Sequence, residues 1–120
     1  MDDEATIVLE YPSAQAIIQS SWNWPFDRKD MEVYGRTGYA ITVERDSLKV
    51  RRAGEKTEQT VVAGQVPSPY GDSITYLCAV VRDGLKPDGF SSLETNVIVT
   101  EILDAARQSA TKGKTVILKP

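Results

Sequence analysis

The hydrophobic pattern of this chain changes its period once, across residues 64–71, and that change restricts the folds available to it. Before this segment, apolar and polar residues alternate in short runs, as they do in β-strands with one covered face. After it, apolar residues recur at every third or fourth position, as on one side of a helix. The segment itself holds Pro67 and Pro69, so we expect an irregular connection. The 120 residues fit one domain, residues 1–120, with strands first and helices second.

Six alternating runs are predicted as strands. A charged loop at residues 27–30 separates the second from the third, and short turns separate the others; strands joined by short turns pair in antiparallel fashion. On the fourth run we expect Tyr39, Ile41 and Val43 to face inward. The predicted strands are residues 5–11, 14–24, 31–36, 39–44, 47–52 and 58–62.

The first helix is predicted directly after the irregular connection. It should begin at Asp72 or Ser73, which are good capping residues, and end near Gly84. We expect Cys78 to be a buried structural thiol, because it lies on the apolar stripe of this helix and has no basic partner nearby. The stripe consists of Ile74, Leu77, Cys78 and Val81.

The second helix completes the predicted fold. Ser91 is its expected N-cap, because Glu94 lies three positions later and completes a capping box. It should end at residues 112–113, and residues 114–118 then form a closing strand or an extended tail. The predicted fold class is α+β: an open-faced, mostly antiparallel β-sheet of about six strands, with two helices packed on one face.

Both tryptophans of the chain lie at the end of the second predicted strand. Alternation places Trp22 and Trp24 on one face of that strand, and Pro25 then ends it because proline has no N–H for a ladder. Two indoles on one face belong either to the core or to the wall of a binding surface. The sequence favours the core, because aromatic side chains gain most from burial.

The opposite face of the second strand is polar but uncharged. A sheet face of this kind suits a surface covered by something polar, such as another subunit. Tyr34 and Arg36 share one face of the third predicted strand beside it, and these two residue types are enriched at interfaces. The candidate oligomer or ligand face is Gln15, Gln19, Asn23, Tyr34 and Arg36.

Composition excludes several classes of function. The chain has no histidine, which removes Ser-His and Cys-His nucleophiles and histidine zinc sites, and its single cysteine gives no internal disulfide or metal cluster. A net charge of −3 argues against nucleic-acid binding, and no apolar run could cross a bilayer. The acidic start is unlike an export signal, so we expect a cytoplasmic protein. The residues taken alone therefore predict no catalytic, cofactor-binding or metal-binding set.

Four segments, taken in order, resemble a known family. They are residues 5–12, the element Ser21-Trp22-Asn23-Trp24-Pro25, residues 31–35, and the helix and its end from residue 92 to 114. The last segment closes with small residues followed by Ser109-x-x-x-Gly113-Lys114. Together they resemble the C-terminal part of the glucose-fructose oxidoreductase, inositol dehydrogenase and rhizopine-catabolism family. The likeness covers nearly the whole chain.

This resemblance implies a piece of a larger enzyme. Members of the family are two-domain NAD(P)-dependent dehydrogenases: a Rossmann domain precedes an open-faced α/β domain whose sheet commonly mediates oligomerisation. This sequence has neither the glycine-rich loop, nor a Glu-Lys-Pro motif, nor a histidine, so no catalytic or cofactor-binding residue carries over to it. The resemblance implies the C-terminal part of a sugar or polyol oxidoreductase that forms a homo-oligomer through its sheet and supplies part of the substrate wall. The resemblance implies NAD or NADP as the cofactor of the full-length family members, bound by a Rossmann domain that would be the missing partner of this chain. This chain alone is expected to be inactive.

Two other functions fit the residues. One is a self-associating interaction module that uses the candidate face and needs no second domain. The other is a small sugar-binding domain in which Trp22 and Trp24 stack on a sugar ring, which requires exposed indoles.

Overall fold

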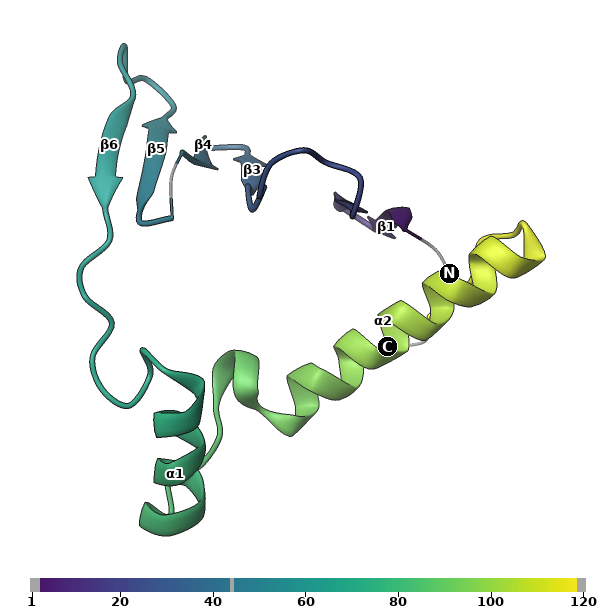
Figure 1. Ribbon diagram of the computed structural model, residues 1–120. Helices are drawn as coiled ribbons and strands as arrows, with labels where there is room; N and C mark the ends of the chain where they lie inside the picture. The colour runs from purple at the N-terminus through teal and green to yellow at the C-terminus, as the bar shows by residue number, and fades with distance from the viewer. Residues whose placement is uncertain (1–2, 44, 119–120) are drawn as a thin grey trace. The chain divides into compact units, whose positions relative to one another are not determined.

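The structure, a computed structural model, describes residues 3–43 and 45–118 (Figure 1). In the described ranges, six strands precede two α-helices and one short 3-10 helix, so the predicted α+β class is confirmed. The order is β1 (Glu4–Tyr11), β2 (Ala14–Ser21), β3 (Glu32–Gly35), β4 (Gly38–Thr42), β5 (Ser47–Arg52), β6 (Gln59–Val62), α1 (Ser73–Asp83), η1 (Gly89–Ser91) and α2 (Leu93–Lys112).

The chain divides into two compact units. One contains the residues up to Ala5 together with Gln19–Pro67, and the other contains Thr6–Ile18 together with the residues from Ser68 on. The strands form two sheets, a two-stranded sheet of β1 and β2 and a four-stranded sheet in the order β3-β4-β5-β6. The single domain and the packing of the helices on one face of the sheet stay predictions.

The four-stranded sheet is an antiparallel meander whose register sorts its side chains onto two faces. Directly paired residues point to the same face, and neighbours along a strand point to opposite faces. One row of the register is Glu32, Ile41, Lys49 and Thr60, and the next is Val33, Ala40, Val50 and Gln59. We call the two sides the polar face (Glu32, Tyr34, Tyr39, Ile41, Ser47, Lys49, Arg51, Thr60 and Val62) and the apolar face (Val33, Ala40, Leu48, Val50 and Val61, with Thr42, Arg52 and Gln59).

A glycine closes the β3–β4 hairpin. Gly38 has a φ of 153°, and a Cβ atom at this position would collide with the carbonyl oxygen of Arg51 on β5. The neighbouring strand therefore approaches the backbone too closely for any side chain, which is one of the uses of glycine in sheets. Gly35 and Gly38 form the last pair of the β3–β4 ladder, so the turn predicted at residues 37–38 lies one position earlier, at residues 36–37.

Strand β2 is shorter than predicted and ends at Ser21. The amide of Trp22 still donates to the carbonyl of Asp3 at 2.8 Å. The amide of Asn23 then donates to the Ser21 hydroxyl at 2.9 Å, a local bond that turns the backbone out of the strand. Placing both tryptophans on one strand face was therefore wrong, because a side-chain hydrogen bond ends β2 before Pro25.

Helix α1 begins and ends within the predicted bounds. Asp72 is its cap: its carboxylate accepts from the amide of Thr75 at 2.7 Å, and this backbone hydrogen bond lowers the pKa of Asp72. Gly84 ends the helix in the left-handed conformation. The expected burial of Cys78 was wrong, because the thiol is exposed. The other members of its stripe are also exposed.

Helix α2 begins one residue later than predicted. Ser92, not Ser91, accepts from the amide of Thr95 at 3.2 Å, and its own hydroxyl donates to the Thr95 hydroxyl at 2.9 Å. Ser91 belongs to η1, whose 3-10 turn draws it out of the capping position. The predicted end is confirmed, with Gly113 in the left-handed conformation after α2.

The most buried apolar side chain described is Ala105, on α2, which is 8% exposed. Beside α2, residues 114–118 run back as an extended tail, so the tail and not the closing strand is present. None of the helices in the described ranges is long and apolar enough to cross a membrane.

The cap of α2 gives the first testable prediction. Replacing Ser92→Ala should lower the free energy of unfolding by about 1 kcal/mol, because the amide of Thr95 loses its acceptor at the helix start. Urea unfolding followed by circular dichroism measures this change. Ser91→Ala is the matched control and should have little effect. Equal losses from both variants would contradict the assigned cap.

Candidate functional site

Two tyrosines stand side by side on the polar face. Tyr34 on β3 and Tyr39 on β4 are paired in the register, and their ring centroids lie 5.7 Å apart at 42°. Tyr34 is 68% exposed. The Tyr34 hydroxyl donates to Glu32 at 2.8 Å and the Tyr39 hydroxyl donates to Glu58 at 2.6 Å. Each hydrogen bond holds the proton on the phenol, so the pKa of both tyrosines is raised.

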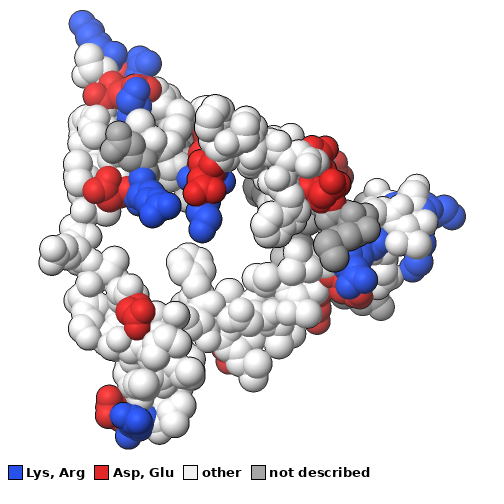
Figure 2. Space-filling model, viewed as in Figure 1, with Lys and Arg blue, Asp and Glu red and all other residues white. Residues whose placement is uncertain are grey.

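Charges next to these tyrosines are largely matched with one another. The Glu58 carboxylate lies 3.6 Å from the Lys49 ammonium, and the hydrogen bond from Tyr39 lowers the pKa of Glu58. Arg51 donates to the backbone carbonyl of Glu55 at 3.1 Å. Figure 2 shows the two signs interspersed over the β5–β6 part of the molecule. A surface of this kind suits a polar partner rather than a strongly charged ligand.

The five candidate residues do not lie in one sheet. Gln15 and Gln19 share one face of β2, in the two-stranded sheet, while Tyr34 belongs to β3 in the four-stranded sheet. Arg36 follows β3 in the hairpin turn, so it is not a strand residue. Asn23 follows β2, where its side-chain amide donates to the Glu4 carboxylate at 3.3 Å. The Ser21 hydroxyl donates to the same carboxylate oxygen at 3.1 Å.

Sequence reasoning missed the tyrosine pair. It placed Tyr39 and Ile41 on one face, as the register does, but did not see that Tyr34 shares that face. The missing signal was cross-strand: the short turn between Gly35 and Gly38 makes Tyr34 and Tyr39 direct partners. The contact between the Tyr39 hydroxyl and Glu58 has no signal within one strand either, because it joins residues of β4 and of the segment before β6.

The tryptophan segment, residues 22–26, is a second exposed aromatic surface. Trp22 is 85% exposed and Phe26 is 81% exposed, so the predicted core position of Trp22 was wrong. Trp24 is partly buried, and the guanidinium of Arg28 lies 5.1 Å from the centre of its ring. The bond from Arg28 to Asp30, at 2.7 Å, fixes that guanidinium and lowers the pKa of Asp30.

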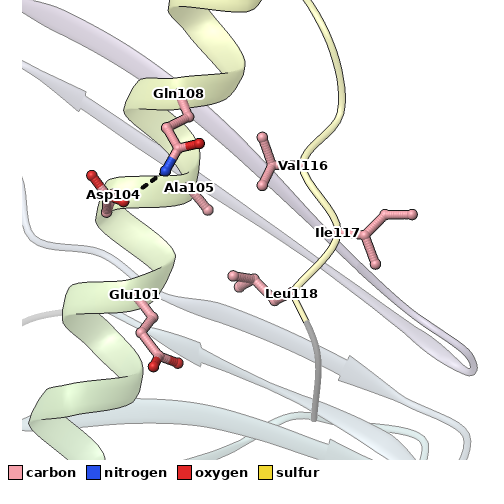
Figure 3. A pocket seen from close by; sticks show the side chains of 7 residues that line it. All are labelled: Glu101, Asp104, Ala105, Gln108, Val116, Ile117 and Leu118. Atoms are coloured by element: carbon pink, nitrogen blue, oxygen red, sulfur yellow. Dashed lines mark hydrogen bonds between the residues drawn. The ribbon is translucent and has the colours of Figure 1, made fainter.

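A shallow hollow of about 320 Å³ lies between α2 and the tail (Figure 3). In Figure 3 Leu118 points toward the helix and Ile117 points away from it. The Gln108 side chain donates to the Asp104 carboxylate at 2.8 Å, so these two polar groups already have hydrogen-bond partners without a ligand. The hollow is lined by Glu101, Asp104, Gln108, Val116, Ile117 and Leu118, around Ala105. Across the described residues, no group of three acidic, histidine or cysteine side chains could hold a metal ion.

Comparisons with protein-family models, with curated proteins and with solved structures gave no match for this chain. The interpretation of its surfaces therefore rests on the geometry above.

The bond between Tyr39 and Glu58 predicts a pH-dependent contribution to stability. The raised pKa of Tyr39 means that its share is complete below the ordinary tyrosine pKa and is lost as pH rises through the raised value. The lowered pKa of Glu58 means that its share is present above the ordinary glutamate pKa and is lost as pH falls through the lowered value.

The variant Glu58→Gln should bring the pKa of Tyr39 down toward the ordinary value and leave that of Tyr34 unchanged. Tyrosine ring signals in an NMR titration report each phenol separately. The control Glu32→Gln should act on Tyr34 instead, because that carboxylate accepts from Tyr34. A Tyr39 titration curve that does not move in Glu58→Gln would refute the assignment.

Proposed function

We propose that this chain acts as an oligomerisation and partial substrate-wall domain of an NAD(P)-dependent sugar or polyol oxidoreductase, and that it is not catalytic alone. The observation that carries the proposal is the polar face of the four-stranded sheet, with the exposed Tyr34 beside Tyr39. Tyrosine is enriched at the centres of protein interfaces, where its ring buries a large area and its hydroxyl still finds a partner.

The charge pattern supports a protein partner for this face. Hydrogen bonds to carboxylates already orient both phenols, so little rotamer freedom remains to be lost on association. Lys49 and Glu58 are matched within the chain, so a second copy meets no excess of like charge. A homodimer contact about a two-fold axis is isologous, which means that the same face of each copy meets the other. Such a face must not carry an excess of one charge.

The enzymatic part of the proposal comes from the sequence resemblance. Segments 5–12, 21–25, 31–35 and 92–114 resemble the second domain of family members that bind NAD(P) in a separate Rossmann domain. In that arrangement the cofactor and the catalytic residues reside outside this chain. The same polar face also serves the alternative function, a self-associating module that works without a second domain.

Light scattering tests the proposed oligomer. The wild type should have the mass of a dimer or larger, and Tyr34→Glu should reduce it, because a carboxylate placed beside Glu32 at the interface centre repels its copy. Tyr34→Phe is the matched control, since it keeps the ring and should keep the mass. Gln19→Glu tests the two-stranded sheet separately. A monomeric wild type would end the oligomer proposal.

A second candidate is sugar binding, which the exposure of Trp22 favours. An indole that is 85% exposed offers an open ring face on which a sugar can stack. Monosaccharides and polyols should then quench tryptophan emission in the wild type and in Trp24→Phe, but not in Trp22→Phe. Emission that ignores sugars in all three proteins would remove this candidate.

A further inference from the structure

Strand β6 is the outer strand of the four-stranded sheet, and half of its backbone groups face away from β5. The amide of Ala63, just after β6, donates to the carbonyl of Asp46 at 2.6 Å and so faces β5. Backbone groups alternate in direction along a strand, so those of Val61 face β5 too. The N–H and C=O groups of Thr60 and Val62 therefore face outward. None of the described residues pairs with them in the sheet.

Apart from its short length of four residues, this edge has none of the usual protection against pairing. Natural edge strands are guarded by charges, prolines or bulges, which discourage another strand from adding. Strand β6 reads Gln-Thr-Val-Val and has no charge, proline or glycine. The opposite edge differs: Met31 accepts from the amide of Thr42, so the outward groups of β3 belong to Glu32 and Tyr34. There a carboxylate stands on the edge, whereas β6 is open.

We propose that β6 pairs with β6 of a second copy of this chain, antiparallel, about a two-fold axis that passes Val61. This register sets Thr60 opposite Val62 of the second copy, twice by symmetry, and each such pair exchanges both of its backbone hydrogen bonds. In this register, every outward N–H and C=O group of β6 bonds to a group of β6 in the second copy. The result is one continuous antiparallel sheet across two copies.

Side chains agree with this register. Val61 meets its own copy in a pair without backbone hydrogen bonds, where side chains come closest, and two valines there extend the apolar face across the axis. Glu58 stands opposite Gly64 of the second copy, so no like charges meet. A shift by one pair of residues would set Glu58 opposite Val62 and leave an outward group of β6 without a β6 partner.

The edge contact is separate from the polar face of the proposed function. It is made by backbone groups of β6, and Tyr34 lies on the other edge strand. The Tyr34→Glu variant should therefore leave β6 pairing intact even where it lowers the mass of the assembly. Loss of the polar-face contact in Tyr34→Glu therefore does not imply loss of the edge contact, whereas a monomeric wild type would exclude both.

Disulfide trapping tests the register. In a Cys78→Ser background, Val61→Cys places two thiols across the axis, where Cα atoms of such a pair lie about 4.5 Å apart, within reach of a disulfide. Mild oxidation should give several-fold more crosslinked dimer than Val33→Cys. Val33 is the matched control, because it lies on the same apolar face and is 52% exposed against 47% for Val61. Equal crosslinking of the two variants would overturn the proposal.

Proline variants test the backbone bonds. Adding Thr60→Pro to the Val61→Cys protein removes an outward N–H without touching the ladder to β5, so the crosslink should be largely lost. Glu32→Pro removes an outward N–H on the opposite edge and should leave the crosslink unchanged. A crosslink that survives Thr60→Pro would contradict the pairing.

Amide hydrogen exchange needs no substitution and covers the case in which a variant fails to fold. The amides of Thr60 and Val62 should exchange more slowly as protein concentration rises, because dimerisation gives them acceptors. The outward amide of Glu32 on the opposite edge should not respond through this contact. Exchange at Thr60 and Val62 that is independent of concentration would refute the proposed dimer.

Discussion

The antiparallel backbone ladder of β3–β6 is the interaction on which the surfaces of this protein depend. Its strands are only four to six residues long, and each gains its definition from the neighbour to which it is bonded. The ladder fixes the register, and the register decides which side chains stand together. That register requires glycine at position 38, because the backbone of Arg51 lies where the Cβ atom of any other residue would be.

With the register set, hydrogen bonds from Tyr34 and Tyr39 fix the side chains of the polar face. Phenols with raised pKa values donate to carboxylates, and Glu58 in turn lies beside Lys49. The groups are satisfied within the chain and are fixed before any partner arrives, which lowers the entropy cost of association. The same sheet leaves β6 with outward backbone groups and no charge. The face and the edge thus offer two different kinds of contact, one through side chains and one through the main chain.

The tryptophan segment shows how a local bond can override a longer pattern. Alternation alone would carry β2 through Trp24, but the Ser21 hydroxyl accepts from the amide of Asn23 and bends the chain away. Glu4 secures the bend by accepting from both Ser21 and Asn23. Trp22 is left exposed as a result, while Trp24 is covered by Arg28. An expected core element becomes an accessible aromatic surface.

The sequence by itself determined the class of fold, the order of the elements and most of their bounds. Period, glycines, prolines and caps are local signals, and they were sufficient for β5, for α1 and for the end of α2. The start of α2 was displaced by one residue, because the 3-10 turn of η1 takes up Ser91 and leaves Ser92 as the cap.

Only the tertiary structure decided which residues meet. Of the five predicted site residues, Gln15 and Gln19 lie in one sheet, Tyr34 lies in the other, and Asn23 and Arg36 lie outside the strands; no single-strand pattern contains that division. The pair of Tyr34 and Tyr39, the bond from Tyr39 to Glu58 and the free edge of β6 all arise from pairing between strands. Hydrophobic alternation tells which residues of one strand lie on the same face of the sheet. The neighbouring strand and its register, and hence the site, depend on hydrogen bonds between strands, which the pattern within one strand does not report.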